Sequence, residues 1–82
     1  MAQRYATRIG ELFPEVVRAA SAAGVENAGD WYVYGGGGGY SWYIVRPDRR
    51  GMVHLARSDR DAYYALRGVL AGFEVASKKV PL

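Results

Sequence analysis

Apolar residues recur every three or four positions in two stretches of the chain, which is the spacing of one face of an α-helix. In the first stretch, residues 5–23, the stripe keeps its phase through Pro14. Because proline loses a helical hydrogen bond, we predict one kinked helix or two short helices in line. Gly24 then provides a C-terminal stop, since the residue after a helix commonly takes the left-handed conformation that glycine favours.

The second helical stretch begins at Ser58 and continues to about Ser77. Asp61, three residues after Ser58, resembles the third position of a capping box. Gly68 and Gly72 lie within this helix, and we expect them to pack closely against the alanine-rich end of the first helix or to form a subunit contact. The predicted buried stripe consists of Ala62, Leu66, Val69, Leu70, Phe73 and Ala76.

Between the helices, apolar and polar positions alternate with the period of half-buried strands. Trp31 and Val33 share one face of the first strand, whereas Tyr32 and Tyr34 share the other. Two further strands, over residues 41–45 and Met52–Ala56, alternate in the same way.

The apolar faces coincide if Val33 lies opposite Trp42, Ile44 lies opposite Val53, and Trp42 lies opposite Leu55. The order of elements is then α-β-β-β-α, and the fold class is α+β. We predict a three-stranded antiparallel meander sheet with two helices packed on one face. The whole chain, residues 1–82, forms one small domain.

One face of this sheet is left without a helix. We predict that Tyr32, Tyr43 and His54 form a row across it, with Tyr34 beside them. Tyrosine rings offer a large contact area with few rotatable bonds to immobilise, so we interpret this face as a candidate partner-binding surface. The alternative is that these aromatic side chains only stabilise the sheet across its strands.

Five consecutive glycines, residues 35–39, separate the first two strands. They form either a simple hairpin loop or a tip that lets a partner approach the backbone closely. A phosphate-binding loop is a poor fit, because no Gly-Lys-Ser/Thr follows and the next residue opens a strand. The candidate partner site therefore also includes Gly36, Gly37, Gly38 and Tyr40.

Basic residues outnumber acidic ones by eleven to eight, so the net charge is +3. This weakly favours anionic partners. Arginines beside aromatic rings can bind single-stranded nucleic acid, and the alternative is a solvated turn with local Arg–Asp pairs. The candidate residues for a nucleic acid or another anionic partner are Arg46, Arg49, Arg50, Arg57 and Arg60.

The α-β-β-β-α order is also that of double-stranded-RNA-binding domains. The similarity is one of topology only. Their lysine cluster opens the second helix, whereas Lys78 and Lys79 close it in this chain, so we do not assign the family.

The chain has no cysteine and a single histidine, His54. We predict no metal site, no cofactor and no catalytic residues, because no set of convergent acid–base or ligand groups is recognisable. Without cysteine, a reducing cytoplasmic location fits. No apolar run approaches the roughly 18 residues of a membrane span, and no signal peptide is recognised.

These features predict a small, non-enzymatic protein-binding module. It would engage a protein partner, or a second copy to form a homodimer, through the tyrosine-rich sheet face and the glycine-rich hairpin. A nucleic-acid-binding domain is the alternative. Compact proteins of this kind include phage-type inhibitors that block larger host complexes, a comparison that rests on size and on the lack of catalytic residues.

Overall fold

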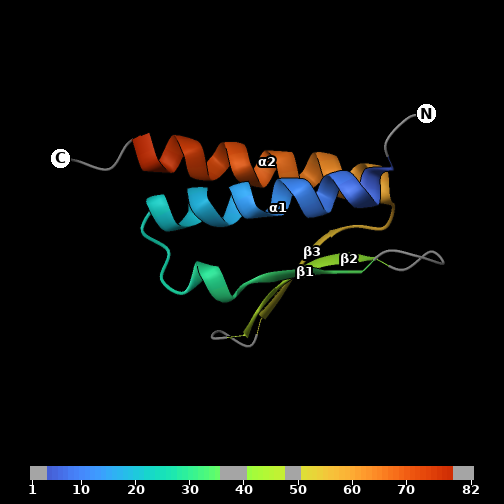
Figure 1. Cartoon of the computed structure of the whole chain (residues 1–82), viewed down its shortest axis with the longest axis horizontal. Helices are drawn as coiled ribbons and strands as arrows, with labels where there is room; N and C mark the ends of the chain where they lie inside the picture. The colour runs from blue at the N-terminus through green and yellow to red at the C-terminus, as the bar shows by residue number, and fades with distance from the viewer. Residues whose placement is uncertain (1–3, 36–40, 48–50, 79–82) are drawn as a thin grey trace.

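Along the chain, one helix precedes three strands and a second helix follows them (Figure 1). The computed structural model describes residues 4–35, 41–47 and 51–78. The predicted α-β-β-β-α order is confirmed, and a short 3-10 turn, η1, is added in the expected connecting loop. The elements are α1 (Tyr5–Ala22), η1 (Ala28–Asp30), β1 (Tyr32–Tyr34), β2 (Trp42–Arg46), β3 (Gly51–Ala56) and α2 (Asp59–Lys78).

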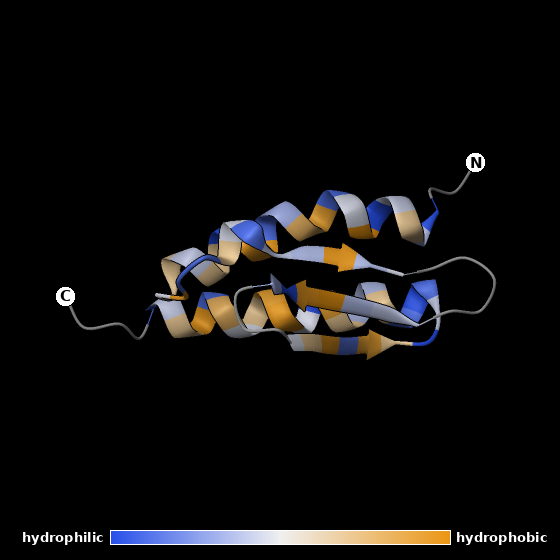
Figure 2. Ribbon diagram, turned by 90° about the horizontal axis from the view of Figure 1, so that it is seen from below, coloured by the Kyte–Doolittle hydropathy of each residue, from blue (hydrophilic) through white to orange (hydrophobic). Residues whose placement is uncertain are grey.

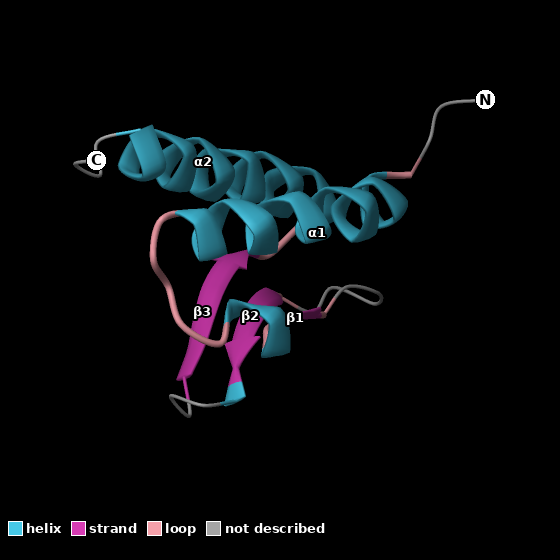
Figure 3. Ribbon diagram, turned by 60° about the vertical axis from the view of Figure 1, so that its left-hand side comes forward, coloured by secondary structure: helices cyan, strands magenta, loops and turns pink. Residues whose placement is uncertain are grey.

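The helices form one layer and the antiparallel sheet, in the order β1-β2-β3, forms the other. Figures 1 and 3 show α1 and α2 side by side on one side of the sheet, running in the same direction. Seen from below (Figure 2), the strands lie nearer to the viewer than the helices, with β1 beside α1 and with β2 and β3 over α2. In the described parts of the chain, no helix is both long enough and apolar enough to cross a membrane.

The end of α1 is set by local backbone chemistry. Gly24 has a φ of +93°, and its N–H donates to the Ser21 carbonyl at 3.1 Å. The Val25 N–H donates to the Ala20 carbonyl at 3.0 Å. These two bonds form a Schellman motif, which satisfies carbonyls that the helix end leaves unpaired. The predicted stop at Gly24 is confirmed, and Pro14 lies within one uninterrupted helix.

The core lies between the helix pair and the sheet. Burying each large aliphatic side chain contributes about 1.5–3 kcal/mol, so the fully buried Ile9, Val16 and Leu66 are main contributors. The indoles of Trp31 and Trp42 close the core on the sheet side. The buried set is Ile9, Phe13, Val16, Ala20, Ala28, Trp31, Trp42, Ile44, Ala62 and Leu66.

One hydrogen bond joins the middle strand to the start of α2. Trp42 Nε1 donates to Asp59 Oδ1 at 2.7 Å. Asp59 also suits the first turn of a helix, because the amino-terminal end of the helix dipole is positive. Beside it, the Asp61 N–H donates to Ser58 Oγ at 3.1 Å, which confirms the predicted cap.

The predicted pairing of the first two strands is wrong by two residues. Val33 lies opposite Ile44, not opposite Trp42. A shift of two residues leaves every side chain on its predicted face, because the side-chain period of a strand is two. The alternation in the sequence is satisfied equally by both registers, so it could not distinguish them.

The pairing of β2 with β3 was predicted correctly at Ile44 and Val53. Beyond that pair the register shifts between Trp42 and Tyr43, so that Trp42 lies opposite Ala56 and not opposite Leu55. Leu55 is therefore an extra residue on β3, as in a β-bulge. The hydrophobic pattern of the sequence does not predict it.

The glycines of α2 do not pack against α1 as predicted. A methyl group at Gly68 or Gly72 would meet no atom within 4 Å. Ala76, which was expected in the buried stripe, is exposed. Larger side chains make the contact instead, such as the fully buried Leu66 and the partly buried Leu70, which packs against the core.

Gly35 at the end of β1 should not tolerate a side chain. Its φ is +134°, and a Cβ there would run into the Ser41 carbonyl oxygen and lie 2.8 Å from Trp42 Cα. We predict that Gly35→Ala lowers the free energy of unfolding by at least about 2 kcal/mol, measured by urea titration. The control, Gly68→Ala in open space on α2, should raise it by about 0.5–1 kcal/mol. Equal stability of Gly35→Ala and the wild type would contradict the conformation assigned to Gly35.

The Trp42–Asp59 hydrogen bond can be isolated with a double-mutant cycle. We predict that Trp42→Phe and Asp59→Ala show a coupling free energy of about 1–2 kcal/mol in urea unfolding, because both remove one charge-assisted bond. Asp59→Asn, which keeps an oxygen acceptor, should lose less stability than Asp59→Ala. Additive effects of the two substitutions would show that the bond contributes nothing to stability.

Candidate functional site

The sheet face that bears no helix carries two cross-strand rows of aromatic and apolar side chains. The first row is Tyr34, Tyr43 and His54. The prediction placed Tyr32 in that row, and the two-residue change of register replaces it with Tyr34. The second row is Tyr32, Val45 and Met52. These six residues are called the open face.

Several side chains of the open face are well exposed to solvent. The exposed fraction is 62% for Tyr34, 50% for Tyr32 and 56% for Met52. Tyr43 and Val45, on the middle strand, are half-buried between their neighbours. Exposed apolar groups that gather across three strands are more informative than single ones, because contiguous patches on monomers are often binding sites.

The centre of the open face is an aromatic pair. The Tyr43 and His54 rings meet edge to face, with centroids 5.3 Å apart. Such pairs contribute about 0.5–1.5 kcal/mol beyond the area they bury, so this contact restrains both rings. The pair therefore stabilises the sheet across β2 and β3.

The arginines proposed for an anionic partner are divided by the structure. Arg46, opposite Gly51, lies at the turn end of the β2–β3 hairpin, and Arg57 follows β3 at its other end. These ends are on the order of 15–20 Å apart along the strand. Arg60 is exposed in the first turn of α2, near Arg57 in the chain.

Arg46 does not share the side of the sheet occupied by the tyrosine rows. It follows Val45, so the alternation places it on the helix-facing side. Its Nη2 atom lies 2.8 Å from the position that a Cβ at Gly51 would take, so the guanidinium rests against the bare glycine backbone. Among the described residues, its Nε is buried without a hydrogen-bond partner.

Gly36, Gly37, Gly38, Tyr40, Arg49 and Arg50 lie outside the described residues.

Sequence reasoning missed a second aromatic group, at the amino-terminal ends of the two helices. The Arg8 guanidinium carbon lies 4.3 Å from the Tyr63 ring centroid and 5.1 Å from that of Tyr5. Arg8 Nη2 also donates to the Tyr63 hydroxyl at 3.1 Å. Tyr64 and Arg67 complete this helix-end cluster. The ring centroids of Tyr63 and Tyr64 are 5.4 Å apart, and the Arg67 guanidinium carbon lies 5.9 Å from the Tyr63 ring centroid.

The helix-end cluster has only a weak signal in the sequence. Tyr5 with Arg8, and Tyr63 with Arg67, have the spacing of neighbours on one helix face. Nothing in either helix alone shows that the two pairs meet, because that contact depends on the parallel packing of α1 and α2. The cluster joins the two helices, because Arg8 of α1 contacts Tyr63 of α2. We therefore interpret it as a contact that stabilises the fold.

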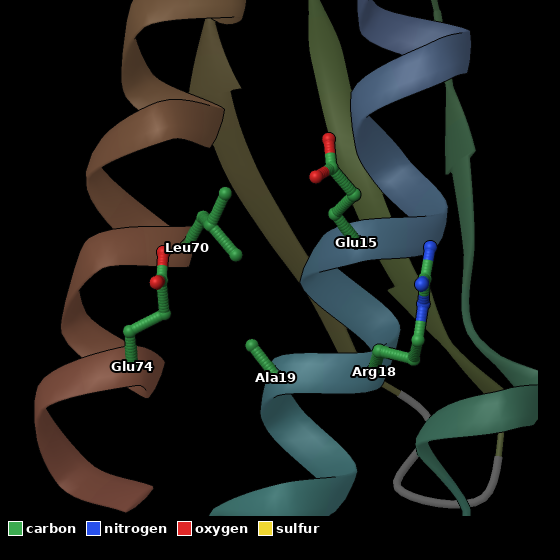
Figure 4. A pocket seen from close by; sticks show the side chains of 5 residues that line it. All are labelled: Glu15, Arg18, Ala19, Leu70 and Glu74. Carbon is green, nitrogen blue, oxygen red and sulfur yellow. The ribbon is translucent and has the colours of Figure 1, made fainter. Parts of the chain in front are cut away.

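A shallow groove runs along the helix–helix seam on the side away from the sheet. Figure 4 shows Leu70 and Glu74 of α2 facing Glu15 and Ala19 of α1, with Arg18 on the far side of α1. Its volume is about 230 Å³, below the roughly 300–1,000 Å³ typical of small-molecule sites. None of the site residues predicted from the sequence lines it.

No group of three or more histidine or acidic side chains among residues 4–35, 41–47 and 51–78 is arranged to hold a metal ion. Comparisons with protein-family models, with curated proteins and with solved structures found no match. The geometry of the chain itself is therefore the basis for a functional proposal.

The bridging role of Arg8 can be tested by a conservative substitution. We predict that Arg8→Lys lowers the free energy of unfolding by about 0.5–1.5 kcal/mol, because lysine keeps the charge but loses the planar stacking and the directed bond to Tyr63. Arg67→Lys is the control. Arg67 approaches one ring at 5.9 Å, so its loss should stay within about 0.5 kcal/mol. Equal losses in thermal or urea unfolding would contradict a bridge specific to Arg8.

Proposed function

We propose that this protein is a small, non-enzymatic protein-binding module of the inhibitor type that acts in the cytoplasm. Its contact surface is the open face, together with the glycine-rich segment that follows Tyr34 in the chain. The single observation that carries the proposal is the pair of aromatic and apolar rows that crosses all three strands without a covering helix.

The residue types of the open face support a protein partner. Tyrosine is enriched among residues that dominate interface energies, and methionine among interface residues generally. The rings add contact area with only two side-chain torsions each to immobilise, which lowers the entropy cost of binding. Because the Tyr43–His54 contact already orders the centre, little of that cost is left for the binding step.

The charge of the open face supports a protein over a nucleic acid. None of its side chains is lysine or arginine. Nucleic-acid binding depends on cationic side chains that contact phosphates, and stacking on aromatic rings accompanies these contacts. Arg46 lies on the other side of the sheet, so a basic rim beside the tyrosines would depend on the other arginines.

The proposal can be tested by affinity capture from the native host, with and without nuclease treatment, using a matched pair of variants. Tyr32 and Tyr64 are similarly exposed, at 50% and 48%, but only Tyr32 is on the open face. We predict that Tyr32→Ala weakens binding of the captured protein at least tenfold, since hot-spot truncation commonly costs 2 kcal/mol or more. Tyr64→Ala should bind like the wild type.

Circular dichroism should show that both variants are folded. If nuclease treatment abolishes the capture of the partner, the proposal is overturned in favour of nucleic-acid binding. A nuclease-resistant protein partner whose affinity is unchanged in Tyr32→Ala and in Tyr34→Ala would show that the open face is not the contact surface.

A further inference from the structure

The outer edge of β3 is the longest unpaired strand edge among the described residues. The sheet order is β1-β2-β3, so β3 pairs only with β2, and it extends from Gly51 to Ala56 whereas β1 has three residues. Figure 2 shows β3 as the outermost strand, with no described element beyond it. At every second residue, such an edge presents backbone N–H and C=O groups that only another extended strand can satisfy in ladder geometry.

Apart from one bulge, β3 lacks the features that usually protect an exposed edge. Its sequence, GMVHLA, contains no proline and no charged lysine, arginine or acidic residue. Met52 and Val53 are both exposed, the latter by 37%, so both faces of the strand offer apolar contact at the edge. The bulge at Leu55 twists only the end nearest α2 and leaves Gly51–His54 in regular pairing with β2.

We propose that β3 pairs antiparallel with β3 of a second copy of this chain, which joins the two sheets into one continuous sheet. This inference is independent of the partner-binding role of the open face, because it uses the strand edge. A two-fold interface brings the same patch together from both copies, so one residue must lie opposite its own counterpart.

Val53 is the residue that best occupies the two-fold position. Val53 would then lie opposite Val53 of the second copy, on the helix-facing side, and both exposed apolar groups would lose water. On the open side, Met52 would lie opposite His54 of the second copy. All of these residues are in the regular part of β3, before the bulge.

The neighbouring flank of α2 is shaped to permit this arrangement. Tyr63, Leu70 and Glu74 lie toward α1, so a period of 3.6 residues places Gly68 and Gly72 on the opposite side of the helix. That side is the one on which β3 lies, because α2 packs against β3 and α1 against β1 (Figure 2). The bare Gly68 and Gly72 leave room for α2 of a second copy above the joined sheets.

Electrostatics gives this dimer a recognisable signature. Each chain carries +3, but β3 itself has no charged side chain, so no like charges lie opposite each other among the paired residues Gly51–Leu55. Repulsion between the two net charges is screened by salt. Self-association should therefore strengthen as salt is raised, which is the opposite of nucleic-acid binding.

The test is sedimentation velocity of the full chain over a series of concentrations and salt concentrations. The wild type is expected to show a concentration-dependent mass that approaches twice the 9.0 kDa of the monomer. Val53→Lys should raise the dimer dissociation constant at least tenfold, because it places two like charges opposite each other on the two-fold axis. Tyr32→Lys, at the far edge of the sheet, is the control and should dimerise like the wild type.

A second variant guards against misfolding of Val53→Lys. Gly68→Leu lies in open space on α2, where leucine favours the helix, so the monomer should fold while the added side chain fills the space needed by the second α2. It is also expected to raise the dissociation constant at least tenfold. A wild type that stays monomeric at about 1 mM, or a dimer unaffected by both variants, would overturn the proposal. Val53 is not on the open face, so Val53→Lys should still bind the captured partner. Tyr32→Ala should still form the dimer, because Tyr32 is not on β3. The two proposals can therefore fail independently.

Discussion

The Trp42 indole is the constraint on which the arrangement of layers depends. It is buried in the middle strand, where its N–H needs a partner, and Asp59 supplies one in the first turn of α2. The bond fixes where α2 starts relative to the sheet. α1 then packs along α2 and over the same side, so that both helices cover one face. The exposure of the opposite face is a direct consequence, because the described residues include no further α-helix to cover it.

The same strands therefore serve two purposes through alternate residues. Ile44 points into the core, whereas its neighbours Tyr43 and Val45 point to the open face. The Tyr43–His54 contact orders the open face from within the sheet, without help from a helix. The result is an exposed aromatic surface without lysine, arginine or acidic side chains, and it is the surface on which the proposed protein partner would bind. The free edge of β3 adds a second, chemically distinct surface, whose demand is for backbone hydrogen bonds.

The tyrosines and arginines of the chain have separate roles that their positions in the sequence do not reveal. Tyr5 and Tyr63 hold Arg8 between the helices, while Tyr32 and Tyr34 face solvent on the sheet. Arg46 rests against Gly51 on the helix-facing side. The composition alone suggested one aromatic and basic surface. The fold distributes these residues over the seam between the helices, the open face and the two ends of a hairpin.

Local chemistry and periodicity in the sequence were enough to determine the order of elements, the end of α1 at Gly24, the Ser58 cap and the face on which each strand residue lies. Each of these depends on residues within a few positions of one another. The tertiary structure alone decided the pairing of Val33 with Ile44, because alternation is unchanged by an even shift. It also decided the bulge opposite Trp42 and the contact of Arg8 with Tyr63, residues far apart in the chain. The physical reason is common to all three: which partner a side chain meets depends on how whole elements pack, and no local pattern records that choice.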